Sequence, residues 1–167
     1  MAALTIRIKK QTDGSAALTC IRADGTATWQ KQLGAQGRFF PYHDLTHYAV
    51  ETTLNHRKGF YGMVASGWNM TDFGAPERKG MLADMDPSEL IVGFLDAERA
   101  SRAQWSAEEC NEKMAVFYEQ HGMPNPPTVT DEQLEAVRRR CRELWDRWEA
   151  VKPGEALELP FPEGAAR

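Results

Sequence analysis

Two histidines four residues apart are the feature of this chain with the clearest chemical potential. They lie in the stretch 39–51 as His43 and His47, with Asp44 between them and Glu51 four residues further on. Histidines at positions i and i+4 share one face of a helix, where two imidazoles can bind one metal ion. The spacing therefore indicates a metal site, with zinc as the first candidate ion and iron as the alternative.

A helix is predicted to carry these side chains. Pro41 suits the first turn of a helix, because the N–H that proline lacks has no partner there. The predicted helix runs from Pro41 to about Arg57 and ends near Gly59. On it the histidines, Asp44 and Glu51 share a sector about 100° wide, with apolar side chains on both sides. Such a helix is expected to be buried, and its polar sector then needs partners.

Glu51 is too far along this helix to share one ion with both histidines. It lies about 9 Å beyond their midpoint along the axis, whereas a glutamate side chain and a metal–oxygen bond together span roughly 7 Å. Glu51 is therefore expected to orient His47 or a bound water. Asp44 or Glu51 could also activate a metal-bound water, and the reaction would then be metal-assisted hydrolysis.

Further ligands must come from outside the helix. The prediction favours the irregular segment 69–87 without choosing among its acidic residues, which are Asp72, Glu77, Asp84 and Asp86. His56 falls on the opposite face of the predicted helix. His121 follows another helix and could approach only through the fold.

Two other interpretations of the histidine pair stay open. Asp44 and Glu51 could simply hydrogen-bond two buried histidines, and the chain would then be a non-enzymatic interaction module. In that case Trp145 and Trp148 on the last predicted helix would carry a homodimer or partner surface. The histidines could also serve catalysis without a metal, although no cysteine adjoins a histidine in the sequence to act as a nucleophile with it.

The motif around the histidines resembles known metal sites. It reads His43-Asp44-Leu45-Thr46-His47 and is similar to the His-Asp-x-x-His motif of a ubiquinone-biosynthesis scaffold family and, more distantly, to zinc hydrolases. The resemblance implies that both histidines bind metal. Gly59 stands where the scaffold family has a glutamate, and Asp44 stands where zinc proteases have one. With its continuation 60–64, the stretch also resembles that of small bacterial proteins without an assigned function.

Composition and charge exclude several classes of protein. The chain has 167 residues, of which 42% are hydrophobic and 26% charged, so it can bury one core. A net charge of -4 argues against a general nucleic-acid binder. No apolar run is long enough to predict a membrane span. The three cysteines are odd in number, far apart and match no zinc or redox spacing, so we expect reduced thiols in a cytoplasmic protein.

The N-terminal third predicts a three-stranded antiparallel β-meander. Leu4, Ile6 and Ile8 alternate with polar residues, which is the period of a half-buried strand. The dipeptide Asp24-Gly25 between the second and third strand-like runs is typical of a hairpin turn.

Four or five helices are predicted to follow and to pack on one sheet face, giving an α+β fold in a single domain over residues 1–151. Beyond the histidine helix, a short helix is expected at 60–68 and a longer one begins near Ser88. Capping boxes open the last two helices, at Ser106 with Glu109 and at Thr130 with Gln133. The remainder, 152–167, is rich in proline, glycine and glutamate and is predicted as an extended or loose tail.

A basic run lies on the last predicted helix. It consists of Arg138, Arg139, Arg140 and Arg142. Acidic residues alternate with these arginines along the helix, so we expect a solvated, salt-bridged face rather than a row of phosphate contacts.

Overall fold

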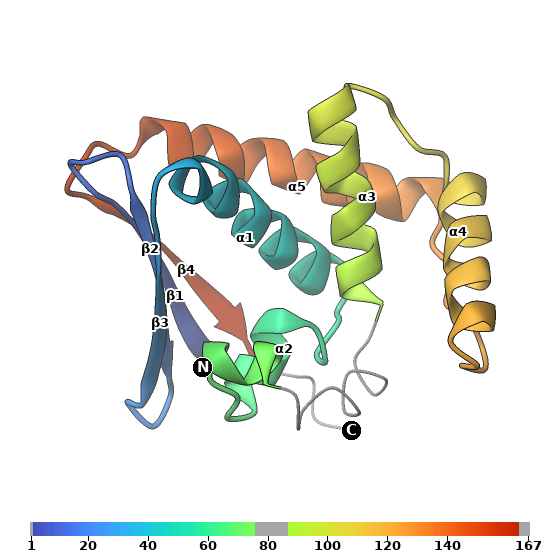
Figure 1. The fold of residues 1–167 in the computed structure, drawn as a ribbon, viewed down its shortest axis with the longest axis horizontal. Helices are drawn as coiled ribbons and strands as arrows, with labels where there is room; N and C mark the ends of the chain where they lie inside the picture. Colours follow the sequence, from blue (N-terminus) through green and yellow to red (C-terminus); the bar gives the residue numbers. More distant parts are fainter. Residues whose placement is uncertain (1, 76–86, 164–167) are drawn as a thin grey trace.

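The described part of the chain contains a four-stranded antiparallel sheet and five α-helices. The computed structural model describes residues 2–75 and 87–163. The strands are β1 (Ala2–Lys10), β2 (Ala16–Arg22), β3 (Ala27–Gln32) and β4 (Ala156–Pro162), in the order β3-β2-β1-β4. The α+β class and the N-terminal meander are thus confirmed, and a fourth strand joins the meander (Figure 1).

The side chains of the sheet explain its two faces. Leu4, Ile6 and Ile8 of β1 are buried, while the residues between them are exposed. Gly25 follows Asp24 in the β2–β3 turn with φ 86°, a backbone conformation that glycine adopts without strain. The buried face receives α1 (Ala35–Thr53), which contacts β2, β3 and β4.

Strand β4 comes from the segment that the sequence predicted as an extended or loose tail outside the domain. Within 152–167, residues 156–162 instead pair with β1, so the chain end completes the sheet. Leu157, Leu159 and Phe161 point into the core. Two prolines are tolerated in β4 because it is an edge strand, where one row of N–H groups has no ladder partner. Residues 164–167 lie outside the described residues.

Helix α1 begins at Ala35, upstream of the predicted start at Pro41, and ends at Thr53 rather than near Arg57. Gly37 makes the early start possible, because a Cβ there would lie 2.8 Å from the carbonyl oxygen of Gln32 at the end of β3. The close packing of this first turn against the sheet outweighs the preference of proline for a helix start.

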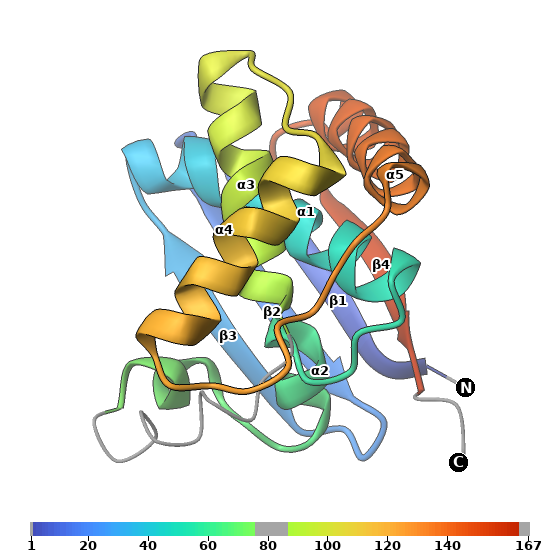
Figure 2. The same ribbon diagram turned by 90° about the vertical axis from the view of Figure 1, so that its right-hand side faces the viewer.

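Four further α-helices and a short 3-10 helix complete the described part of the fold. They are α2 (Phe60–Ala65), α3 (Ser88–Ser101), α4 (Ala107–Gln120) and α5 (Asp131–Ala150), with a short 3-10 helix, η1 (Met70–Gly74). Both predicted capping boxes form. Helices α3 and α5 pack on α1, and α4 lies beside α3 (Figure 2). The apolar stripe of α5 faces inward, including Trp148. Within the described ranges, no helix is long and apolar enough to cross a membrane.

Candidate metal centre

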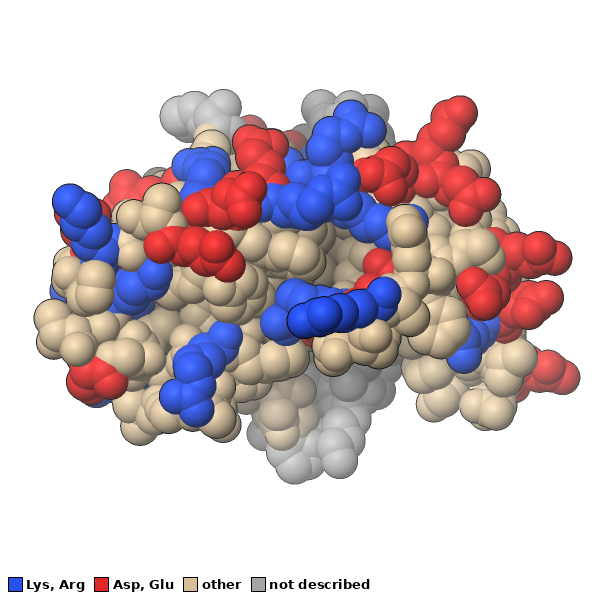
Figure 3. All heavy atoms as spheres, turned by 90° about the horizontal axis from the view of Figure 1, so that it is seen from above, with Lys and Arg blue, Asp and Glu red and all other residues tan. Residues whose placement is uncertain are grey.

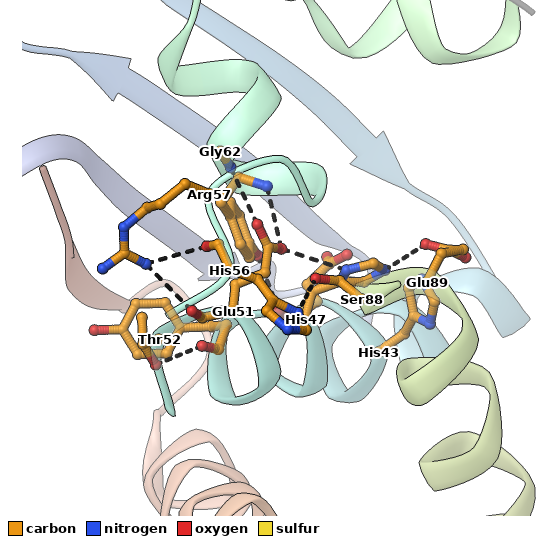
Figure 4. Close-up of polar contacts among 12 residues, drawn as sticks. His43, His47, Glu51, Thr52, His56, Arg57, Gly62, Ser88 and Glu89 are labelled. Atoms are coloured by element: carbon orange, nitrogen blue, oxygen red, sulfur yellow. Dashed lines mark hydrogen bonds and ion pairs between the residues drawn. The ribbon is translucent and has the colours of Figure 1, made fainter. Parts of the chain in front are cut away.

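The polar sector of α1 faces α3, which supplies two carboxylates to the histidines. Nδ1 of His43 donates to Oδ2 of Asp96 at 2.6 Å. Nε2 of His47 lies 3.0 Å from Oε2 of Glu89. Figure 4 shows His43, His47 and Glu89 turned toward one another across the α1–α3 contact. Two histidines and a glutamate thus converge from two helices.

His43, His47 and Glu89 are placed as a three-ligand set. One ligand atom from each lies within 4.8 Å of the others. Ligands about 2 Å from a zinc ion lie at most about 4 Å apart, so a small closure would complete the set. Glu89 can supply that movement, because its side chain is 70% exposed whereas that of His47 is 3% exposed. Asp96 occupies Nδ1 of His43 and so leaves Nε2 for an ion.

Glu51 lies behind His47 and away from this set. Its carboxylate is fully buried and accepts the backbone N–H groups of Tyr61 and Gly62 at 3.2 and 3.1 Å. Its Oε2 lies 3.5 Å from Nδ1 of His47, a buried nitrogen without a hydrogen bond among the described residues. Glu51 and Asp96 therefore occupy corresponding positions, each behind one histidine, as carboxylates do behind metal-bound histidines.

Asp44 is buried beside the histidines but held by the sheet. Its Oδ2 accepts from Nε2 of Gln32 at 2.7 Å. Burial raises the pKa of Asp44 to about 6, against the lowering effects of Gln32 and the histidines. Asp44 is also one of the residues that line the cavity over the histidines. A group with such a pKa can accept and return a proton near neutral pH.

The pKa of His47 is set by competing effects. Burial lowers it, but the carboxylates of Glu51 and Glu89 outweigh burial and raise it to about 10. The same contact lowers the pKa of Glu89. Without a metal, His47 is therefore an imidazolium between two carboxylates, and an ion must displace its proton to bind.

A cavity of about 530 Å³ opens over the histidines. Its polar lining residues are the three candidate ligands together with Gln30 and Asp44. The other walls are apolar or aromatic and comprise Phe40, Phe60, Phe73, Pro87, Leu90, Phe117, Tyr118 and Met123. An ion bound by the three candidate ligands would keep an open coordination position in contact with this space, as catalytic zinc does.

The other predicted ligands lie elsewhere or outside the described residues. Asp72 caps η1 by accepting the backbone N–H of Asn69. Glu77, Asp84 and Asp86 lie outside the described residues. His56 contacts Ser88 through Nδ1, and His121 is exposed and stacked on Phe117.

Sequence reasoning missed Glu89 and Asp96 as site residues. Glu89 falls in the helix that is predicted to begin near Ser88, and it lies in the first turn of α3. Glu89 and Asp96 lie two turns apart on α3 and therefore share one face. This i, i+7 pair of carboxylates is a sequence pattern from which two partners for the histidine pair on α1 could have been proposed.

The thiols offer no alternative chemistry. Cys20, Cys110 and Cys141 are free and buried. Burial raises the pKa of Cys20 and Cys141 to about 12 and that of Cys110 to about 11, so all three are protonated near neutral pH.

Comparison with known proteins adds no functional information. No family model matches the chain, and no curated protein or solved structure is detectably similar to it.

Proposed function

We propose that this protein binds a divalent transition metal, zinc first and iron as the alternative, through His43, His47 and Glu89. The observation that carries the proposal is the convergence of three ligand atoms within 4.8 Å at an open cavity. Two histidines and a glutamate with one free position form a ligand set of catalytic zinc sites. The carboxylates of Asp96 and Glu51 behind the histidines support the same conclusion.

The activity that follows is metal-assisted hydrolysis of a largely apolar substrate. The metal, when bound, would supply a water or hydroxide nucleophile near neutral pH. Asp44 is the candidate proton acceptor, and Glu51 keeps His47 oriented. The aromatic walls of the cavity favour an apolar group beside the bond to be cleaved. We also propose that the helices pack on one face of the sheet. The alternation of buried and exposed residues along β1 supports this packing.

Elemental analysis of untagged protein tests the metal site. We expect about one zinc or iron per chain in wild type and none in the His43→Ala, His47→Ala double variant. The His121→Ala variant is the matched control, because it removes an exposed histidine outside the cluster. Glu89→Gln should bind less metal than wild type, because a neutral amide replaces the anionic ligand. Equal metal content in wild type and the double variant would refute the site.

Hydrolysis is tested separately with aryl esters and amides. Metal-loaded wild type should cleave them, while metal-free protein should not. Asp44→Asn should retain the metal and lose turnover about 100-fold or more, because only the proton acceptor has changed. Turnover that is equal with and without metal would contradict the proposal.

A structural role for the histidines is the second candidate. It is favoured by the partners that both histidines already have, Asp96 and Glu89, at 2.6 and 3.0 Å. The chain would then be a non-enzymatic interaction module. Trp148 is buried, and Nε1 of Trp145 donates to the carbonyl of Tyr42 at 3.4 Å, so a partner or homodimer surface on α5 would have to use its outer face. Absence of metal after addition of zinc and iron would favour this role.

A further inference from the structure

A second cleft, between α3 and α5, is lined by four arginines and one acidic residue. The charged lining residues are Arg99, Arg102, Arg138, Arg142 and Glu98, and the cleft has a volume of about 280 Å³. None of them lines the cavity over the histidines. Figure 3, seen from above, shows Lys and Arg side chains on two sides of a hollow near the middle of this face. This local positive charge contrasts with the net charge of -4 of the whole chain.

Arg138 belongs to the framework of the cleft. Its guanidinium makes two hydrogen bonds to the carboxylate of Glu98 and a third to the carbonyl of Trp105. The side chains of Arg138 and Glu98 are both nearly buried. Since Glu98 is neutralised by Arg138, it does not cancel the charge of the other arginines.

Arg99 is held in place without a strong anionic partner. Its guanidinium lies 5.4 Å from the ring centroid of Phe39, 5.2 Å from that of Tyr42 and 6.0 Å from that of Trp145. The buried Nε has no hydrogen-bond partner among the described residues. The carboxylate of Asp96 lies 3.7 Å from Nη2, beyond hydrogen-bonding distance. The aromatic rings therefore fix a cation whose donors are incompletely used.

Arg102 and Arg142 complete the positive rim. The guanidinium of Arg102 makes no hydrogen bond or ion pair within the described parts of the chain. Arg102 also has φ 59° at the end of α3, where glycine is the favoured residue. Arg142 pairs with Glu135 at 3.0 Å, but both side chains are about half exposed, and such surface pairs are weak. Arg142 can therefore turn to a ligand at low cost.

We propose that the α3–α5 cleft binds a small phosphate monoester. Arg99 and Arg102 would hold the phosphate, with Arg142 as a third donor. Three guanidinium groups suit a dianion better than a single carboxylate, and their planar N–H groups match phosphate oxygens. The cleft exceeds the space that a phosphate alone requires. Leu95 and Trp145 line the remainder and would contact the esterified group.

Calorimetric titration of metal-free protein at constant ionic strength tests this proposal. The probes are phenyl phosphate, inorganic phosphate and acetate. We expect phenyl phosphate to bind tightest, inorganic phosphate more weakly and acetate weakest. Arg102→Gln should weaken phenyl phosphate about ten-fold or more, because it removes a charged donor at the surface. Arg99→Gln should also weaken phenyl phosphate binding about ten-fold or more. Circular dichroism checks that this variant is folded.

Arg139→Gln is the matched control, because it removes an exposed arginine of α5 that does not line the cleft. Its affinity for phenyl phosphate should stay within about two-fold of wild type. Inorganic phosphate binding as tightly as phenyl phosphate would overturn the ester assignment. Acetate binding as tightly as phosphate, or equal losses in Arg102→Gln and Arg139→Gln, would overturn the proposed site. The outcome does not depend on the metal, so the two proposals can fail separately.

Discussion

His47 lies between the carboxylates of Glu51 and Glu89, and this position determines how a metal would bind. Its pKa is raised to about 10, so the imidazole carries a proton near neutral pH. Zinc binds only the neutral form and must release that proton. We expect about one proton released per zinc at pH 7, and an affinity that rises about ten-fold per pH unit between pH 6.5 and 8. Calorimetry in two buffers of different ionisation enthalpy measures the release.

The control for proton release is Glu89→Gln. It removes one of the two carboxylates that raise the pKa of His47, so the variant should release a smaller fraction of a proton as well as bind zinc more weakly. A zinc affinity that is independent of pH would contradict the protonated state of His47.

The metal-free protein should lose stability as the pH rises, because the folded state binds the His47 proton more tightly than the unfolded state does. The contribution is fully present below the ordinary histidine pKa of 6.5 and is lost as the pH rises through about 10. Urea unfolding between pH 7 and 9 should show a falling free energy of unfolding in wild type. His47→Gln should be less stable at pH 7 and give a flatter profile. A parallel decline in both proteins would contradict this assignment.

At the scale of single residues, the sequence predicted the histidine pair but not the carboxylates that contact it. Local spacing was sufficient for His43 and His47, since one helix carries both. Glu89 reaches them only because α3 packs on α1, and the intervening segment 76–86 lies outside the described residues. The i, i+7 spacing of Glu89 and Asp96 shows that two carboxylates share one face of a helix. It does not show that this face meets α1, because tertiary packing decides which helix faces meet. The expected separation of Glu51 from the ligand set followed from helix rise alone.

At the scale of elements, α2 packs closely against the loop that follows α1, and the close contact is at Gly62. A Cβ on Gly62 would lie 2.0 Å from the carbonyl oxygen of Arg57, and backbone atoms cannot move away cheaply. Gly62→Ala should therefore destabilise the fold by about 2–4 kcal/mol. Loss of the Gly62 contact would also disturb Glu51, which accepts its N–H. Chemical denaturation measures the change.

Gly93 provides the opposite case for the same substitution. It lies in the interior of α3, is exposed, and a Cβ there would meet nothing within 4 Å. Gly93→Ala should stabilise the protein by about 0.5–1 kcal/mol, because alanine favours helix. Equal effects of the two substitutions would show that the close approach at Gly62 is not a constraint.

Elements with strong local signals were predictable and those that depend on the sheet were not. The capping boxes at Ser106 and Thr130 fixed two helix starts, because the side chains that cap are adjacent in sequence. The strand at 156–162 contains an alternating apolar set, but its prolines and the glycine before it indicated a tail. Only the pairing with β1, across almost the whole chain length, makes that segment a strand.

At the scale of the whole molecule, Asp96 connects the two proposed sites. Its Oδ2 accepts from His43 at 2.6 Å, and its Oδ1 lies 3.7 Å from Nη2 of Arg99. A phosphate in the α3–α5 cleft would neutralise the charge of Arg99 where it lies, and Asp96 would then interact more fully with His43. A carboxylate that holds a histidine ligand more firmly makes it a better ligand. The two proposals together therefore imply positive coupling between the sites.

We expect saturating phenyl phosphate to tighten zinc binding about 5-fold, and zinc to tighten phenyl phosphate by the same factor, since coupling free energies are reciprocal. Competition titrations at micromolar zinc measure both factors. Asp96→Asn should weaken zinc about 10- to 100-fold and abolish the coupling, while phenyl phosphate still binds. Arg139→Gln should leave the coupling intact. If coupling persists in Asp96→Asn, the connection runs through other contacts between α1 and α3, and the role assigned to Asp96 is refuted.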